Sequence, residues 1–307
     1  MNSVRSSEPD PSRASRIWRR TRVGGSLALV VGLLLWGASG PVGPYLVLGC
    51  GVAMALGCVV ETRAMQLLPG PAGGRGHGLL LGVLAVLTVA VTLVLQVRPG
   101  GVAGRGTFWE LLGGLILLVL AVGVLGLILG WVSRAQSLRV LASLLWIAVP
   151  LPALYLVVVE TGVAGLGALI LLSKVGDIAG YYSGNLLGDR FPHHPFPRLS
   201  PGKTSVGCLG SFIVGTAAGP LVAGWLPDPR WGWASALAAA ALINLASQAG
   251  DLLESAGKRR AGVKDSGTLF GPSGGVLDVV DSLLLSVPMA LITWPLLFEG
   301  LAGHPPA

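Results

Sequence analysis

Residues 107–132, TFWELLGGLILLVLAVGVLGLILGWV, contain a single charged side chain, Glu110. A helix needs about 20 mostly apolar residues to cross the hydrocarbon layer of a membrane. Only a helix or a closed barrel satisfies its backbone hydrogen bonds there. The stretch is long enough to cross and too apolar for a protein surface in water. We therefore expect a membrane-spanning helix over these residues.

The same pattern recurs on both sides of this stretch. Residues 23–60 hold no charge, but Gly40, Pro41, Gly43 and Pro44 in the middle predict two helices joined by a tight turn. Six more apolar stretches bring the expected number of spans to about nine. They cover residues 78–97, 140–159, 161–173, 204–226, 231–252 and 276–298. The stretch 161–173 is short, and the sequence leaves open whether it crosses or re-enters. These stretches predict an all-α, polytopic transmembrane helical bundle.

The composition agrees with a membrane protein. Hydrophobic residues make up 52 % of the 307 residues, charged residues only 11 %, and the mean hydropathy is +0.74. A soluble domain carries about 25 % charged residues. This shortfall excludes an ordinary soluble enzyme, a disordered chain and a disulfide-rich scaffold. We expect a multi-pass protein of the cell (inner) membrane.

The basic residues predict the orientation of the chain. Six arginines precede the first apolar stretch, namely Arg5, Arg13, Arg16, Arg19, Arg20 and Arg22. Basic residues near membrane spans mark the cytoplasmic side, so we expect a cytoplasmic N-terminus. Arg98 and Arg105 would face outward but are outnumbered. A signal peptide is the disfavoured alternative for the start, because the next apolar stretch follows almost at once.

The chain then divides into four parts. We expect a basic cytoplasmic tail over 1–22, N-terminal transmembrane helices over 23–173, a catalytic transmembrane domain over 174–299 and a short C-terminal tail over 300–307. Two polar segments of the third part, 174–203 and 250–281, hold every lysine of the chain and seven of its 14 acidic residues. Ionisable groups close to the membrane are costly and indicate a functional site. The four lysines and seven acids are Lys174, Lys203, Lys258, Lys264, Asp177, Asp189, Asp251, Glu254, Asp265, Asp278 and Asp281.

The segment 250–281 combines features of a nucleotide site. Its glycine-rich turn over 262–275 leads into a helix, and free N–H groups at a helix start suit phosphate. Asp278 and Asp281 are three residues apart, which predicts two carboxylates on one face in the first turn of that helix. Such carboxylates beside cations are what a Mg²⁺-nucleotide site requires. The alternative is that acids in a first turn only complement the helix dipole.

The segment 174–203 ends in Ser200-Pro201-Gly202-Lys203-Thr204 at the expected start of a helix. A turn followed by Lys203 and Thr204 offers a second anion contact. The string is not a P-loop, because the G-x-x-x-x-G-K-[ST] spacing is absent. His193 and His194 in the same segment are interpreted as part of a solvated linker.

Residues 173–285 resemble the phosphatidate cytidylyltransferase family, the CDP-diacylglycerol synthases. The family pattern is Ser, two residues, Lys-Arg, four residues, Lys-Asp, then Gly-Gly, two residues, Asp, two residues and Asp. It is matched by Ser255, Lys258, Arg259, Lys264, Asp265, Gly274, Gly275, Asp278 and Asp281. An acidic, glycine-rich loop ending in Ser-Pro-x-Lys-Thr is matched by Asp177, Ser200, Pro201, Lys203 and Thr204. Ser273 and Val279 stand where the family usually has His and Arg, and these departures leave the carboxylates in place.

The resemblance implies transfer of a cytidylyl group from CTP to phosphatidic acid, giving CDP-diacylglycerol and diphosphate. It implies Mg²⁺ as cofactor and leaves open whether K⁺ joins it. The implied catalytic residues are Ser255, Lys258, Arg259, Lys264 and Asp265. The implied substrate-binding residues are Ser200, Lys203, Thr204, Gly274 and Gly275. The implied metal ligands are Asp265, Asp278 and Asp281, with Asp251 as a further candidate.

Three other functions stay open at this point. The first is a cytidylyltransferase for another lipid phosphate. The second is a transporter or channel, which would scatter acids among several helices and repeat between halves. The third is a catalytically silent relative, suggested by Ser273 and Val279. Membrane lipids are expected partners and a homodimer is left open. Nucleic acid is not expected, because no basic face carries aromatic residues.

Overall fold

The computed structural model describes residues 13–68, 77–97, 104–224 and 232–297, and within these ranges it contains helices and no β-strand. The N-terminal part holds α1 (Arg13–Gly37), α2 (Gly43–Ala64), α3 (His77–Gln96), α4 (Gly104–Ile128), the 3-10 turn η1 (Arg134–Gln136) and α5 (Ser137–Ala148). It is followed by α6 (Leu154–Leu187), α7 (Ser205–Ala223), α8 (Trp233–Ala261), the 3-10 turn η2 (Gly271–Ser273), α9 (Val276–Val280) and α10 (Leu283–Leu297).

Seven helices among the described residues are long and apolar enough to cross a membrane. They cover Gly43–Ala64, His77–Gln96, Phe108–Ile128, Leu154–Leu187, Ser205–Ala223, Trp233–Ala261 and Val276–Trp294. A shorter apolar helix, Gly24–Gly37, forms the end of α1. The predicted all-α, polytopic membrane fold is therefore confirmed, although about nine spans were expected and seven helices of the described residues are long enough to cross. The cytoplasmic N-terminus stays a prediction.

The region expected to hold two spans, 140–159 and 161–173, is divided differently. The helix α5 ends after 12 residues at Ala148, and α6 begins at Leu154 and runs for 34 residues. Pro150 and Pro152 lie in the break, and proline disfavours helical backbone at the residue before it. A kink within α6 lies at Gly162, whose φ of 70° is easily reached only by glycine.

The segment 174–203 is also different from the expectation, because its first half is helical. The helix α6 continues to Leu187, and only residues 188–204 form a loop before α7. Small residues explain this extension, since Gly180 and Gly184 let α7 approach. A Cβ added at Gly180 would lie 3.1 Å from the backbone oxygen of Gly207, and one at Gly184 would lie 3.1 Å from Thr204 Oγ1. Small residues commonly allow such close helix packing in membranes.

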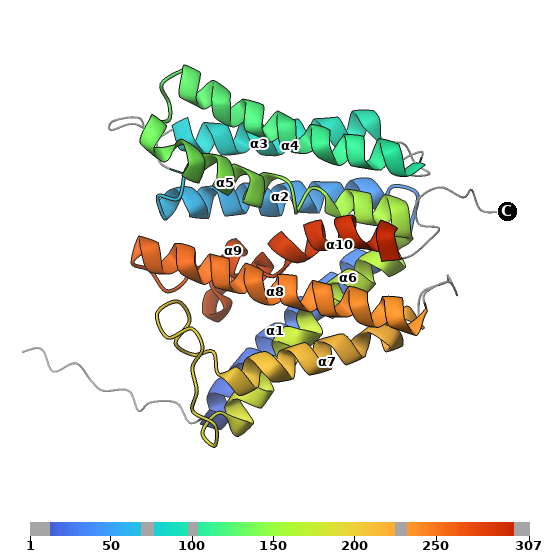
Figure 1. Ribbon diagram of the computed structural model, residues 1–307, viewed down its shortest axis with the longest axis vertical. Helices are drawn as coiled ribbons and strands as arrows, with labels where there is room; N and C mark the ends of the chain where they lie inside the picture. Colours follow the sequence, from blue (N-terminus) through green and yellow to red (C-terminus); the bar gives the residue numbers. More distant parts are fainter. Residues whose placement is uncertain (1–12, 69–76, 98–103, 225–231, 298–307) are drawn as a thin grey trace, which may run out of the picture.

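The helices stack in layers, and Figure 1 shows α3 and α4 as the outermost layer above α2 and α5. The helix α8 packs between α7 and α10, while α6 packs against α7. The helix α2 contacts α6 and α9 and so joins the N-terminal helices to the C-terminal ones. The ends of α2 and α8, the loop 188–204, η2 and α9 lie toward one end of this bundle (Figure 1). The predicted polar segments meet at that end.

The predicted division of the chain stays a prediction. Its boundary at 173/174 falls inside α6, and its boundary at 22/23 falls inside α1. The tail over 300–307 lies outside the described residues, as do the first twelve residues.

Candidate functional site

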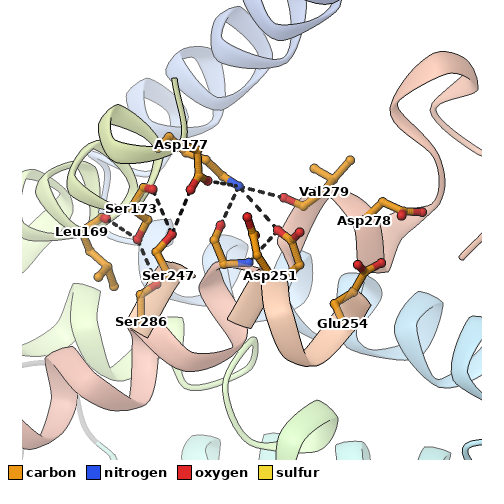
Figure 2. Close-up of polar contacts among 12 residues, drawn as sticks. Leu169, Ser173, Asp177, Ser247, Asp251, Glu254, Asp278, Val279 and Ser286 are labelled. Atoms are coloured by element: carbon orange, nitrogen blue, oxygen red, sulfur yellow. Dashed lines mark hydrogen bonds and ion pairs between the residues drawn. The ribbon is translucent and has the colours of Figure 1, made fainter. Parts of the chain in front are cut away.

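Polar side chains at this end form two neighbouring clusters. We call Glu61, Glu254, Lys258, Ser266 and Asp278 the Asp278 cluster. We call Lys174, Asp177, Lys203, Asp251 and Asp281 the three-aspartate cluster. Figure 2 shows Asp278 and Glu254 on one side of Asp251, and Asp177 on the other side.

Asp278, near the start of α9, uses both of its carboxylate oxygens. Its Oδ1 accepts a hydrogen bond from Lys258 Nζ at 2.7 Å. Its Oδ2 accepts from the backbone N–H groups of Ser266 (2.8 Å) and Gly275 (2.7 Å) and contacts Ser266 Oγ at 2.7 Å. Gly274 has a φ of 82° and turns the chain between these donors. Asp278 therefore fastens the glycine-rich turn to the end of α8.

Lys258 joins a second carboxylate to this cluster. Its Nζ lies 2.6 Å from Glu254 Oε2, one helical turn earlier on α8. The Glu254 side chain is 1 % exposed, and its Oε1 has no hydrogen-bond partner among the described residues. Two carboxylates thus share one ammonium group in a largely buried position. Removal of that ammonium would leave two buried negative charges without a counterion.

Glu61, at the end of α2, was not among the predicted site residues. Its Oε1 accepts from the N–H of Val276 (2.7 Å), and its Oε2 accepts from the N–H of Leu277 (2.9 Å) and contacts Ser266 Oγ at 2.6 Å. The helix start that was predicted to suit phosphate is therefore occupied by the carboxylates of Glu61 and Asp278. Glu61 is the first charged residue after the uncharged residues 23–60, but that position does not indicate its partners.

The three-aspartate cluster is centred on Lys174 of α6. Its Nζ donates to Ser282 Oγ (2.6 Å) and to the backbone oxygen of Val279 (3.2 Å). It also lies 3.5 Å from Asp177 Oδ2 and 4.0 Å from Asp281 Oδ1. Lys174 therefore links α6 to the junction of α9 and α10.

Asp251 of α8 completes this cluster. Its Oδ2 lies 3.1 Å from Lys203 Nζ, which extends from the loop before α7. The carboxyl groups of Asp251 and Asp281 lie close enough to interact directly, and the charge of Asp177 acts on both. Three carboxylates, from α6, α8 and the junction of α9 and α10, thus lie close together, with Lys174 between Asp177 and Asp281 and Lys203 beside Asp251.

Asp278 and Asp281 were predicted to project together from one helix face, but they lie in different clusters. The helix α9 ends at Val280, so Asp281 lies at the junction before α10. Asp251 and Asp281 come together, Asp278 is held in the neighbouring cluster, and Asp265 is exposed on the loop after α8. Their roles as metal ligands stay predictions.

The fit of these residues to a divalent cation can be judged from their chemistry. Carboxylate oxygens are the ligands that Mg²⁺ prefers. In the described part of the chain, however, no three His, Cys, Asp or Glu side chains are placed to hold a metal ion. The donor types in the three-aspartate cluster fit Mg²⁺, with Lys174 and Lys203 now balancing their charge. Both oxygens of Asp278 are already engaged.

The remaining predicted residues surround the two clusters. Arg259 Nε donates to the backbone oxygen of Leu199 at 3.3 Å, which ties the loop 188–204 to α8. Thr204 caps α7, since its Oγ1 accepts from the N–H of Gly207 at 3.0 Å. Ser255 is partly buried on α8, and Lys264 is exposed. Ser200 lies at the end of the loop 188–204, and Gly274 and Gly275 form the buried turn before α9.

Three residues interpreted as neutral or unfavourable have structural roles. His193 Nδ1 hydrogen-bonds Ser205 Oγ, and His194 Nδ1 lies 3.2 Å from the backbone oxygen of Lys203. Both histidines are exposed in the loop that carries Lys203, and these contacts help to shape it. The Val279 side chain packs against the hydrophobic core.

Comparisons with known proteins agree with this picture. The sequence model described as the cytidylyltransferase family matches residues 18–297. A phosphatidate cytidylyltransferase of Pseudomonas aeruginosa is 35 % identical over 245 residues, covering 79 % of this chain and 77 % of that protein. Those of Brucella suis and Mycobacterium leprae are 42 % and 36 % identical over 113 and 143 residues, or 37 % and 46 % of this chain. These two matches span only 40 % and 43 % of the relatives' own length.

Proposed function

Because this chain belongs to the cytidylyltransferase family, we propose that it transfers a cytidylyl group from CTP to phosphatidic acid, giving CDP-diacylglycerol and diphosphate. One observation of the site carries this proposal. Lys203 and Lys258 lie beside Asp251, Asp278 and Asp281 at one end of an apolar bundle. Such a site can hold phosphates and a cation next to a lipid.

The reaction needs charge neutralisation more than it needs a base. A phosphate oxygen of phosphatidic acid, already anionic, would attack the α-phosphorus of CTP. The bond from that phosphorus to the bridging oxygen would break, and diphosphate would leave with the electron pair. The difficulty is the approach of two anions, which fixed positive groups relieve. Lys203, Lys258, Arg259 and Lys264 would hold the phosphates, and Ser255 would position one of them.

Asp251 and Asp281 would hold Mg²⁺, with Asp177 as a third carboxylate. When bound, the ion would supply positive charge to the phosphates. Lys174 would keep the three carboxylates together, and Lys203 would move between Asp251 and a phosphate. The predicted roles of Asp265 and Asp278 as ligands are kept as the alternative to this assignment, and K⁺ remains an additional candidate.

The location of the reaction follows from its substrates. CTP is water-soluble and cytosolic, so the end of the bundle with both clusters would face the cytoplasm. The acyl chains would enter sideways between the helices. The protein would then be a multi-pass protein of the cell (inner) membrane with its N-terminus in the cytoplasm.

The test is Mg²⁺-dependent incorporation of radiolabelled CTP into lipid by the purified protein in detergent. Phosphatidic acid is supplied as acceptor, and Asp281→Asn protein of equal thermal stability serves as the control. We expect labelled lipid that requires both Mg²⁺ and phosphatidic acid. Absence of label above the control, from folded protein, would contradict the proposal. Label only with another lipid phosphate would change the acceptor and keep the chemistry.

A further inference from the structure

We propose that Glu61 of α2 is a positioning residue, which holds the loop 262–275 and α9 in the arrangement that the reaction needs. This role rests on the proposed function for its kinetic consequences. It extends the site to the N-terminal helices, where the sequence indicated only membrane packing.

Glu61 makes three contacts across more than 200 positions of the chain. Its two oxygens accept the N–H groups of Val276 and Leu277 and contact the Ser266 hydroxyl. The first N–H groups of a helix have no partner inside the helix. A carboxylate is the strongest acceptor for them and complements the positive end of the helix dipole. Glu61 thus fixes the start of α9 to α2.

The backbone around Glu61 fits closely against its carboxylate. A Cβ added at Gly275 would lie 2.2 Å from Glu61 Oε1, and one added at Gly267 would lie 2.6 Å from the same atom. Neither position could carry a side chain without moving Glu61. The two glycines therefore let the loop wrap around the carboxylate of a distant helix.

The consequence reaches Asp278 and Lys258 through Ser266. The Ser266 hydroxyl lies 2.6 Å from Glu61 Oε2 and 2.7 Å from Asp278 Oδ2, and Asp278 in turn holds Lys258. Loss of the Glu61 carboxylate would remove the attachment of Ser266 and of the start of α9 to α2, and would leave Asp278 alone to hold the loop. Lys264 and Asp265 of this loop are exposed. We therefore expect the loop to contact CTP, the water-soluble substrate, rather than the lipid.

The first experiment compares Glu61→Gln with wild type in steady-state transfer of the cytidylyl group. Glutamine keeps the shape but removes the charge and one acceptor atom. We expect the KM for CTP to rise about tenfold while the KM for phosphatidic acid changes less than about twofold, since misplaced groups weaken only the contacts they make. A smaller folded fraction would lower the rate and leave both KM values unchanged. Glu110→Gln, an exposed acid of α4, is the matched control and should match wild type.

The second experiment needs no activity and measures amide hydrogen exchange in the same two variants. We expect Glu61→Gln to accelerate exchange at residues 264–280 and to leave α4 and α7 as in wild type. An exchange pattern equal to wild type, or unchanged KM values for both substrates, would overturn the proposal. If wild type transfers no cytidylyl group, the proposed function fails, while the exchange result still decides whether Glu61 holds the loop.

Discussion

The Asp278 cluster and the three-aspartate cluster lie side by side but differ in how closely protein groups bind their carboxylates. Asp278 accepts or contacts four protein groups, all at 2.7 or 2.8 Å. Asp177, Asp251 and Asp281 have ion pairs of 3.1 to 4.0 Å and repel one another. The protein's own groups engage both oxygens of Asp278, whereas the carboxylates of the second cluster are the ones we propose for a cation. The comparison teaches that aspartates three residues apart can lie in different surroundings, Asp278 fixed to the loop by short hydrogen bonds and Asp281 among other carboxylates.

The largest expected effect is on activity in the three-aspartate cluster. Asp281→Asn removes a charge of the proposed cation site, and we expect the transfer rate to fall about 10³-fold. The melting temperature should stay within a few degrees of wild type, because the change relieves repulsion between carboxylates. Rate measurements with labelled CTP, combined with thermal unfolding in detergent, check both parts. A rate within tenfold of wild type would contradict the proposal that the three-aspartate cluster, rather than the Asp278 cluster, serves the reaction.

The second effect is on stability in the Asp278 cluster. Lys258→Met leaves Glu254 and Asp278 without their shared ammonium, and we expect the free energy of unfolding to fall by about 3 kcal/mol. Thermal unfolding in detergent measures this change. Lys264→Met, at an exposed position, provides the comparison and should leave the melting temperature unchanged. Equal melting temperatures for the two variants would show that the buried pair carries no stability.

The third effect concerns the fit between Glu61 and the loop. Gly275→Ala places a methyl group 2.2 Å from Glu61 Oε1, and we expect a loss of about 2 kcal/mol in unfolding free energy. Gly202→Ala is the matched change, since nothing lies within 4 Å of its added Cβ. If thermal unfolding in detergent shows that the two variants are equally stable, Glu61 is free to move away and the loop is not fixed by it.

The smallest effect is at the start of α7, which carries Lys203 toward Asp251. Thr204→Ala removes the side-chain acceptor for the Gly207 N–H, which should cost about 1 kcal/mol. Thr204→Ser keeps the acceptor and should restore the melting temperature. If serine fails to restore it, the methyl group of Thr204 matters more than its hydroxyl.

The fold could be predicted from the sequence because apolar length determines which helices can cross a membrane. The helix boundaries within residues 140–203 could not be predicted from apolar length. The break between helices lies at Pro150 and Pro152 instead of near residue 160. The helix α6 continues into the polar segment 174–203, because its glycines pack against α7. Composition identifies a polar segment, but it does not show which residues of that segment pack against another helix and so stay helical.

The site could be predicted where its residues fall in the two polar segments, since 174–203 contained Lys174, Asp177 and Lys203. The segment 250–281 contained Asp251, Lys258, Asp278 and Asp281, and all of them lie in the two clusters. The role of Glu61 could not be predicted, because it depends on which distant helix end meets α9. The glycine-rich turn indicated free N–H groups correctly, but the chain supplies its own carboxylates to them. A single sequence does not show whether N–H groups at a helix start bind a phosphate or a carboxylate of the same chain.

The most direct test of the difference between the clusters is a titration of purified protein with Mn²⁺ followed by electron paramagnetic resonance. Mn²⁺ binds the same oxygen ligands as Mg²⁺. Wild type is compared with Asp281→Asn and Asp278→Asn proteins, each shown to be folded. We predict that Asp281→Asn weakens Mn²⁺ binding about tenfold or more, whereas Asp278→Asn leaves it within about threefold of wild type. Loss of binding in Asp278→Asn with normal binding in Asp281→Asn would contradict the account.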